Sequence, residues 1–272
     1  MKKFLLGSVA LAAMIAGPAM AADMPLKAPP PVVSYYDWSG YYIGFSIGGM
    51  WSTVDRTFPN PQNFPAAGFG PGPGGNFSTS SNDAVYDVHV GAQWQWYQWV
   101  LGVEAAYIGC FRECRSLTGV LPTGTGGANT LFTPNTIAEN KITNLFTVGP
   151  RLGYAWDRWM VFATGGLAGA SLKGTYCSSI TQLCNAGVGQ NGQSQNWGWY
   201  AGGGFEYMIA KGSFADAIAG IEYQYFDVGD VHAFANNTSQ DFNLAAHGST
   251  VRARLTIKWN PGPYSGAVVA KY

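Results

Sequence analysis

Val251-Arg252-Ala253-Arg254-Leu255-Thr256-Ile257-Lys258-Trp259 is the stretch that decides the fold of this chain. Every odd position is apolar and every even position is charged or hydroxylic. Alternation of period two is typical of a β-strand, whereas an amphipathic helix places its apolar residues three and four positions apart. The stretch therefore predicts a strand with one apolar face and one polar face.

The same alternation recurs along the chain in stretches of about ten residues or more. It predicts eight strands, at about 40–51, 82–96, 99–108, 140–156, 159–172, 196–208, 215–226 and 251–259. Three short turns, at 97–98, 157–158 and 211–213, alternate with four long polar loops, at about 52–81, 109–138, 173–193 and 227–247. This rhythm predicts an all-β fold, an eight-stranded antiparallel up-and-down transmembrane β-barrel.

Composition agrees with a barrel in a membrane. Charged residues make up 11% of the chain, where an ordinary soluble domain has about a quarter, and aromatic residues make up 15%. No segment after the N-terminal region has 18 consecutive apolar residues, so a closed barrel is the remaining way to satisfy a backbone in lipid. A soluble β-sandwich is the alternative, but it would not concentrate indole rings beside short turns. Such rings predict an aromatic girdle, formed by Trp94, Trp96, Trp99, Trp156, Trp159, Tyr207 and Trp259.

The N-terminus predicts export. Two lysines, an apolar run of about a dozen residues and the triplet Ala19-Met20-Ala21 are typical of a secretory signal peptide, and the run is shorter than the roughly 20 residues of a membrane anchor. We expect a signal peptide at 1–22, a proline-rich periplasmic leader at 23–37, the barrel at 38–260 and a C-terminal tail at 261–272. The expected location is the outer membrane with both termini in the periplasm.

The alternation assigns the charges of the strands to the barrel interior. A basic residue facing lipid at the midplane costs about 2 to 4 kcal/mol, so the polar faces should line the lumen. The predicted lumen network contains Asp87, Glu104, Arg151, Glu206, Glu222, Arg252, Arg254 and Lys258, with His89 beside it. Four acids face four bases, which favours a salt-bridge plug, with Glu222 against Arg252 or Arg254 and Glu104 against Arg151 as expected pairs.

Two functions remain open for the lumen. Eight strands enclose an interior just wide enough for side chains, so general diffusion is not expected, while a small ion or solute pathway is the alternative. Without Lys2 and Lys3 the chain has 13 basic against 15 acidic residues, and the basic ones are scattered, which excludes nucleic acid as a partner.

Cysteines and histidines offer few reactive sites. Four cysteines in an exported chain predict disulfides, and local pairing is favoured among the three pairings: Cys110 with Cys114 and Cys177 with Cys184. Zinc would need four converging ligands, so no metal and no cofactor are expected. His232 and His247 share the last predicted loop, which leaves loop-mediated haem or host-ligand binding as a further alternative.

An enzyme is the remaining class to weigh. Some eight-stranded barrels modify lipid A through a histidine near the outer leaflet. Here His89 alternates in phase with Asp87 and Gln93, so it faces the lumen, and we expect no catalytic residue.

Several segments resemble a known family: the Ala19-Met20-Ala21-Ala22-Asp23 signal end, Trp38-Ser39-Gly40-Tyr41-Tyr42-Ile43-Gly44, and the stretches 198–207 and 220–225. They resemble the small outer-membrane immunogenic proteins of alphaproteobacteria, often labelled porin family. The architecture is also similar to the membrane half of outer membrane protein A. The resemblance implies a surface antigen of the Gram-negative envelope that supports envelope integrity. The expected partners are outer-membrane lipid, lipopolysaccharide, the barrel assembly machinery and surface ligands bound by the loops.

Overall fold

The computed structural model describes residues 36–57, 77–117, 136–178, 192–235 and 242–259. Within them the chain forms strands β1 (Gly40–Thr57), β2 (Phe77–Trp96), β3 (Trp99–Cys110), β4 (Arg115–Leu117), β5 (Thr136–Trp156), β6 (Trp159–Ser178), β7 (Gly192–Ala210), β8 (Ala215–Ala235) and β9 (Phe242–Trp259). No helix in these ranges is long and apolar enough to span a membrane. The predicted signal peptide, most of the leader and the C-terminal tail lie outside the described residues.

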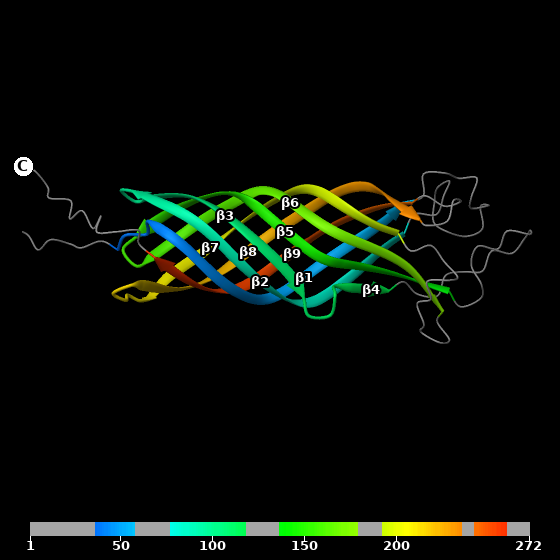
Figure 1. Cartoon of the computed structure of the whole chain (residues 1–272), viewed down its shortest axis with the longest axis horizontal. Helices are drawn as coiled ribbons and strands as arrows, with labels where there is room; N and C mark the ends of the chain where they lie inside the picture. The colour runs from blue at the N-terminus through cyan, green and yellow to red at the C-terminus, as the bar shows by residue number, and fades with distance from the viewer. Residues whose placement is uncertain (1–35, 58–76, 118–135, 179–191, 236–241, 260–272) are drawn as a thin grey trace, which may run out of the picture. The chain divides into compact units, whose positions relative to one another are not determined.

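Eight long antiparallel strands close into a barrel. The sheet order is β3-β2-β1-β9-β8-β7-β6-β5-β4, and an additional pairing of β3 with β5 closes the ring. The short β4 pairs with β5 beyond the end of β3. Figure 1 shows the strands crossing the long axis at a steep tilt, as an up-and-down barrel requires. The predicted fold class is confirmed.

Three tight connections lie together at one end of the barrel, which we call the turn end; the opposite end is the far end (Figure 1). Two of the connections begin with a residue of positive φ, Tyr97 at 56° and Asp157 at 55°. The left-handed conformation reverses the chain within two residues, so that Trp96 pairs with Trp99 and Trp156 with Trp159. The third connection, after Ala210, leads into β8.

The strands extend further toward the far end than the sequence predicts. β1 continues to Thr57 instead of ending near Trp51, and β8 continues to Ala235 instead of ending near Phe226. The segment around Arg115, predicted as loop, contains β4. These strand ends carry hydroxyl, amide and charged side chains outside, so the apolar alternation that predicts a lipid-facing strand is absent there.

The outer wall divides into two zones. Exposed large apolar side chains, such as Tyr41, Phe45 and Trp51 on β1, cover the part nearer the turn end. From Tyr41 to Trp51 the chain rises about 23 Å at about 3.3 Å per residue and a 45° tilt, close to the apolar band of about 25 Å in such barrels. Beyond the band polar side chains such as Asp55 on β1 and Lys173 on β6 occupy outward positions, while Leu117 on β4 is an exposed apolar exception.

The polarity of the interior also changes from the turn end to the far end, from charged to apolar. At the level of the band the lumen is charged, whereas nearer the far end it holds a cluster of buried apolar side chains. This apolar layer comprises Met50, Val54, Val85, Ile108, Cys114, Ile142, Leu145, Ala168, Ala170, Leu172, Tyr200, Phe226, Val228, Leu244 and Ala246. The barrel interior is therefore charged in the part of the band nearer the turn end. The apolar core begins within the band, where the buried Met50 precedes the exposed Trp51, and it continues where the outer wall is polar.

Candidate functional site

The lumen at the level of the band contains seven charged side chains, which we call the charged belt. They are Asp87, Glu104, Arg151, Glu206, Glu222, Arg252 and Arg254, and each is at most 7% exposed. They come from six strands, because the inward positions of β2, β3, β5, β7, β8 and β9 reach the same height when the register is set. Gly48, opposite Arg252, lets the backbones of β1 and β9 approach closely, because a Cβ there would lie 1.9 Å from the carbonyl oxygen of Val251.

Arg254 is the centre of the charged belt. Its guanidinium lies 2.7 Å from Glu104, 2.5 Å from Glu222 and 3.4 Å from Glu206. Fork-shaped guanidinium groups can donate to several carboxylates at once, which a lysine cannot do with the same geometry. One side chain therefore ties β9 to three other strands, β3, β7 and β8.

Arg252 and Arg151 extend the network on either side. Arg252 lies 2.6 Å from Asp87 and 3.0 Å from Glu222. Arg151 lies 2.7 Å from Glu206 and 3.6 Å from Glu104, and its guanidinium packs 3.8 Å from the ring centre of Phe162. The structure thus brings both expected pairs together, and it gives Glu222 both of its candidate arginines.

Lys258 does not join the charged belt. Its ammonium lies 3.6 Å from Asp216, nearer the turn end, and it donates to the carbonyl oxygens of Asp37 and Ser39 at 2.5 and 3.1 Å. Asp216 was not among the predicted lumen residues, although it alternates in phase with Glu222 on β8. Without Lys258, the charged belt has four carboxylates against three guanidinium groups.

His89 is the titratable neighbour of this unequal set. Its ring is fully buried, with Nδ1 2.9 Å from Asp87 and Nε2 2.9 Å from the Thr256 hydroxyl. Gly44 makes space for the ring, because a Cβ at residue 44 would lie 2.1 Å from Nε2. The histidine therefore belongs to the network by its position and its hydrogen bonds.

A short segment fills the lumen at the turn end. Residues Tyr36–Ser39, which we call the strap, precede β1, and Trp38 is fully buried while Tyr36 is 5% exposed. The indole donates to the carbonyl oxygen of Asp157 at 3.1 Å, and the phenol donates to Asp216 at 2.8 Å. Tyr36 was assigned to the proline-rich leader; here it packs inside the barrel, 5.0 Å from the Trp38 ring.

Polar side chains gather again inside the far end. Arg56 is fully buried and donates to the side-chain oxygen of Asn140 at 2.5 Å, and Asn140 donates to Thr79 at 2.8 Å. The sequence analysis missed this cluster because Arg56 and Thr79 fall in a predicted loop. From the turn end to the far end, the described lumen therefore holds the strap, the charged belt, the apolar layer and this polar cluster.

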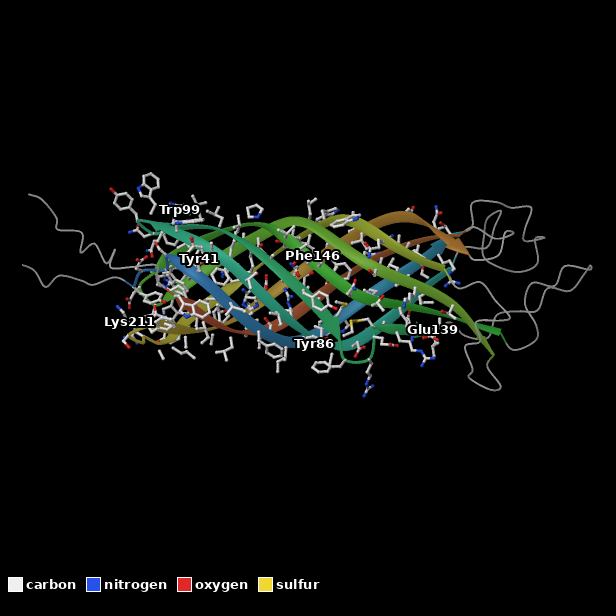
Figure 2. The ribbon with its side chains drawn as sticks, viewed as in Figure 1. Tyr41, Tyr86, Trp99, Glu139, Phe146 and Lys211 are labelled. Atoms are coloured by element: carbon white, nitrogen blue, oxygen red, sulfur yellow. A yellow bond between two sulfur atoms is a disulfide. The ribbon has the colours of Figure 1, made fainter. Side chains whose placement is uncertain are left out.

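The aromatic residues of the expected girdle lie at the turn end. Trp94, Trp96 and Trp99 are 60%, 71% and 48% exposed, and the rings of Trp159 and Tyr207 lie 4.4 Å apart. Figure 2 shows Trp99 at the same end as Lys211, whereas Glu139 lies toward the far end.

The cysteine prediction is confirmed for one pair. Cys110 and Cys114 form a disulfide that links the end of β3 to the residue before β4. The second predicted pair lies outside the described residues, because Cys184 and the side chain of Cys177 are not described.

The two histidines of the last predicted loop lie on strands instead. His247 is on β9, 3.6 Å from Asp55, and His232 is on β8 opposite Asn243, with its side chain outside the described residues. Since His247 pairs with Asp227, the register separates the two histidines by several residues along the sheet. Within the described ranges, no group of three or more His, Cys, Asp or Glu residues could hold a metal ion.

A closed barrel with an apolar outer band and a charged lumen defines a transmembrane β-barrel protein of the outer membrane. The match to the family model described as "outer membrane protein beta-barrel domain" covers residues 9–254. The chain belongs to this family.

Two curated relatives and several solved structures are similar. The 31 kDa outer-membrane immunogenic protein of Brucella melitensis is 31% identical over 276 residues, which cover 95% of this chain and 100% of the relative. The protein of the same name from Brucella suis matches equally. The family resemblance stated from the sequence is thus confirmed.

Among solved structures, OprG from Pseudomonas aeruginosa covers 84% of this chain and 99% of its own, at 11% identity and a TM-score of 0.41. The attachment invasion locus protein Ail of Yersinia pestis covers 78% and 99%, at 12% identity and a TM-score of 0.33. The outer membrane protease OmpT of Escherichia coli covers 84% and 100%, at 7% identity and a TM-score of 0.44.

Proposed function

We propose that this protein is a closed outer-membrane barrel that contributes to envelope structure and meets its surroundings through its outer wall and far-end loops. The observation that carries the proposal is the charged belt. Its guanidinium and carboxylate groups bridge the lumen at 2.5 to 3.6 Å, which leaves no room for hydrated solutes between them. Burial of charges in this way is tolerated when they pair, so the network is stable as a plug.

Two further layers support closure. The strap occupies the turn end of the lumen with the fully buried Trp38, and the apolar layer lies on the other side of the charged belt. An ion passing through would have to displace an indole ring, separate several ion pairs and cross an apolar core.

The proposed orientation places the turn end in the periplasm and the far end at the cell surface. Short periplasmic turns and longer outer loops are general for such barrels. Strands of 18 to 21 residues, as in β1 and β5, exceed the apolar band, so the barrel wall would project above the outer leaflet. This projecting wall, with the segments that follow each strand at the far end, would present the contact surface.

A non-catalytic role is also part of the proposal. Asp87, His89 and Thr256 form a hydrogen-bonded line that has the connectivity of a catalytic triad. All three side chains are at most 2% exposed, however, and the lumen is filled on both sides of them. The line therefore supports a packing role. Lipid A modification by the refolded protein that disappears in His89→Ala would overturn this part.

Planar-bilayer recording tests the closed lumen. The full mature chain, refolded and inserted, should show no unitary conductance, and the heat-dependent shift in gel mobility confirms that it is folded. A porin inserted in parallel is the positive control. Unitary steps in the wild type would overturn closure, and steps that grow in Glu104→Ala and Arg254→Ala would favour the small-pore alternative.

Deletion of the gene tests the envelope role. A strain without the protein should become more sensitive to detergent. An unchanged envelope would count against the structural role while leaving the conductance result untouched.

A further inference from the structure

Three basic side chains lie side by side on the outer wall beyond the apolar band, and we call them the base row. Arg115 on β4 pairs in register with Lys141 on β5, and Lys141 pairs with Lys173 on β6. Like charges directly opposite each other on neighbouring strands destabilise a sheet. The base row is therefore an arrangement that an anion bound across it would stabilise.

Two carboxylates already hold part of the base row in place. Glu139 lies 2.7 Å from Arg115 and 3.1 Å from Lys141, and Glu113 lies 2.5 Å from Lys141. The Lys141 ammonium keeps the pKa of Glu113 below its usual value, so this carboxylate stays charged in mild acid. The described ion pairs of these carboxylates involve Arg115 and Lys141 but not the exposed Lys173. With Asp83 and Arg112, which line a pocket together with Glu113 and Arg115, the described group has three acids against four bases, and this leaves a net positive charge.

The basic residues are confined to one side of the wall. Among the described residues, the outward-facing Arg and Lys of the far half are the base row and Arg112, which lies in the turn before β4. The remaining outward ones, Arg158 and Lys211, belong to the turn end. On the opposite side of the far half, β1 and β8 carry Asp55 and Asp227 instead.

The height of the base row matches lipid headgroups. Lys173 follows the girdle residue Trp159 by 173 − 159 = 14 residues on β6. Fourteen residues rise about 33 Å at about 3.3 Å each and a 45° tilt, about 8 Å beyond an apolar band of about 25 Å. Leu167, 60% exposed, is the last large apolar side chain exposed on β6 before it. The ammonium therefore lies just outside the hydrocarbon.

We propose that the base row binds a phosphate group of an outer-leaflet glycolipid. Lys173 would contact the phosphate directly, and Arg115 and Lys141, held by Glu139, would complete a positive surface around it. Arginine and lysine donate strong charge-assisted hydrogen bonds to phosphate oxygens. The acyl chains would lie on the apolar wall below, beside Phe146 (Figure 2) and the exposed Leu167. This inference rests on the outward orientation of the far end in the proposed function.

Binding to defined vesicles tests the site. The refolded full chain is reconstituted in phosphatidylcholine vesicles. The affinity of the protein for lipid A is then measured by raising the content of either diphosphoryl lipid A or the same lipid A without phosphates. Each base near a charged lipid surface contributes about a fivefold change in affinity, so Lys173→Gln should weaken binding about fivefold. Lys211→Gln, an exposed lysine at the turn end, is the matched control and should bind as the wild type does.

The arms of the experiment separate the outcomes. Equal binding by Lys173→Gln and wild type, or binding that does not depend on the lipid phosphates, would overturn the site. Release of the lipid by millimolar inorganic phosphate would identify free phosphate as the ligand and would also overturn the lipid assignment. Conductance is measured on the same preparations. Lost lipid A binding without conductance means that only this site fails, whereas unitary conductance means that the closed lumen fails.

Discussion

Replacing Arg254 by Met tests the charged belt most directly, because the change keeps an unbranched flexible stem and removes the guanidinium group with its charge. Arg254 is 3% exposed and contacts Glu104, Glu206 and Glu222 at 2.7, 3.4 and 2.5 Å. Removing one partner of a buried ion pair costs about 3 to 5 kcal/mol. The variant would leave four carboxylates against two guanidinium groups.

The lower end of that range is expected, because each carboxylate keeps a second base. Arg151 remains near Glu104 and Glu206, at 3.6 and 2.7 Å, and Arg252 remains 3.0 Å from Glu222. We therefore expect Arg254→Met to lower the free energy of unfolding by about 3 kcal/mol. Arg254→Lys keeps the charge but loses the guanidinium fork. Its free energy of unfolding should lie between that of Arg254→Met and that of the wild type.

Equilibrium unfolding by urea in lipid vesicles, followed by tryptophan fluorescence, measures this difference. The double variant Arg254→Met/Glu222→Gln removes one carboxylate together with the base, so it should recover part of the loss. If the free energy of unfolding of Arg254→Met lies within about 1 kcal/mol of the wild-type value, the central role of Arg254 is refuted, because a loss of about 1 kcal/mol is expected for an exposed ion pair. Failure of the double variant to recover stability would show that the loss comes from packing instead of charge.

Three further variants test other parts of the barrel by the same unfolding assay. Gly44→Ala should destabilise the barrel by about 1 to 3 kcal/mol, because the added Cβ would lie 2.1 Å from His89; Gly49→Ala, where the nearest atom is a Trp51 ring carbon at 3.3 Å, should cost less. Trp38→Ala removes a fully buried indole and should cost about 3 to 5 kcal/mol, while conductance stays absent because the charged belt remains; an unchanged unfolding midpoint would argue against the strap. Phe45→Arg places a charge on the lipid-facing wall and should cost about 2 to 4 kcal/mol, and a neutral result would mean that this wall does not face lipid.

The sequence predicts the membrane part of the barrel well, because lipid imposes a simple rule there. Along Val251–Trp259 each apolar side chain meets hydrocarbon and each polar one meets the lumen, so period two is visible without knowledge of any neighbour. The rule fails above the band. Thr53 and Asp55 face outward there while Val54 is buried, so the strand continues with its polarity reversed and was predicted as loop.

Pairing within the lumen is harder to predict than membership of the lumen. Arg254 and Glu104 are 150 residues apart in sequence, and their contact depends on the stagger of the strands between them. Lys258 and Arg254 lie on the same face of β9, yet only the register shows that Lys258 reaches Asp216 and the strap while Arg254 reaches the charged belt. Charge counting from the sequence thus does not show that Lys258 pairs with Asp216 outside the charged belt.

The reversal of polarity along the strands has a consequence for the position of the barrel along the membrane normal. A shift of about 8 Å or more toward the turn-end side of the membrane would pull Lys141 and Asp55 into hydrocarbon, and the reverse shift would expose Trp51 and its neighbours to water. Either displacement is opposed by a solvation cost on every strand at once, so the barrel has a fixed depth without any anchor. A membrane of different thickness would have to adapt to the protein, by thinning or thickening at its rim, because the rigid closed wall cannot change its own length.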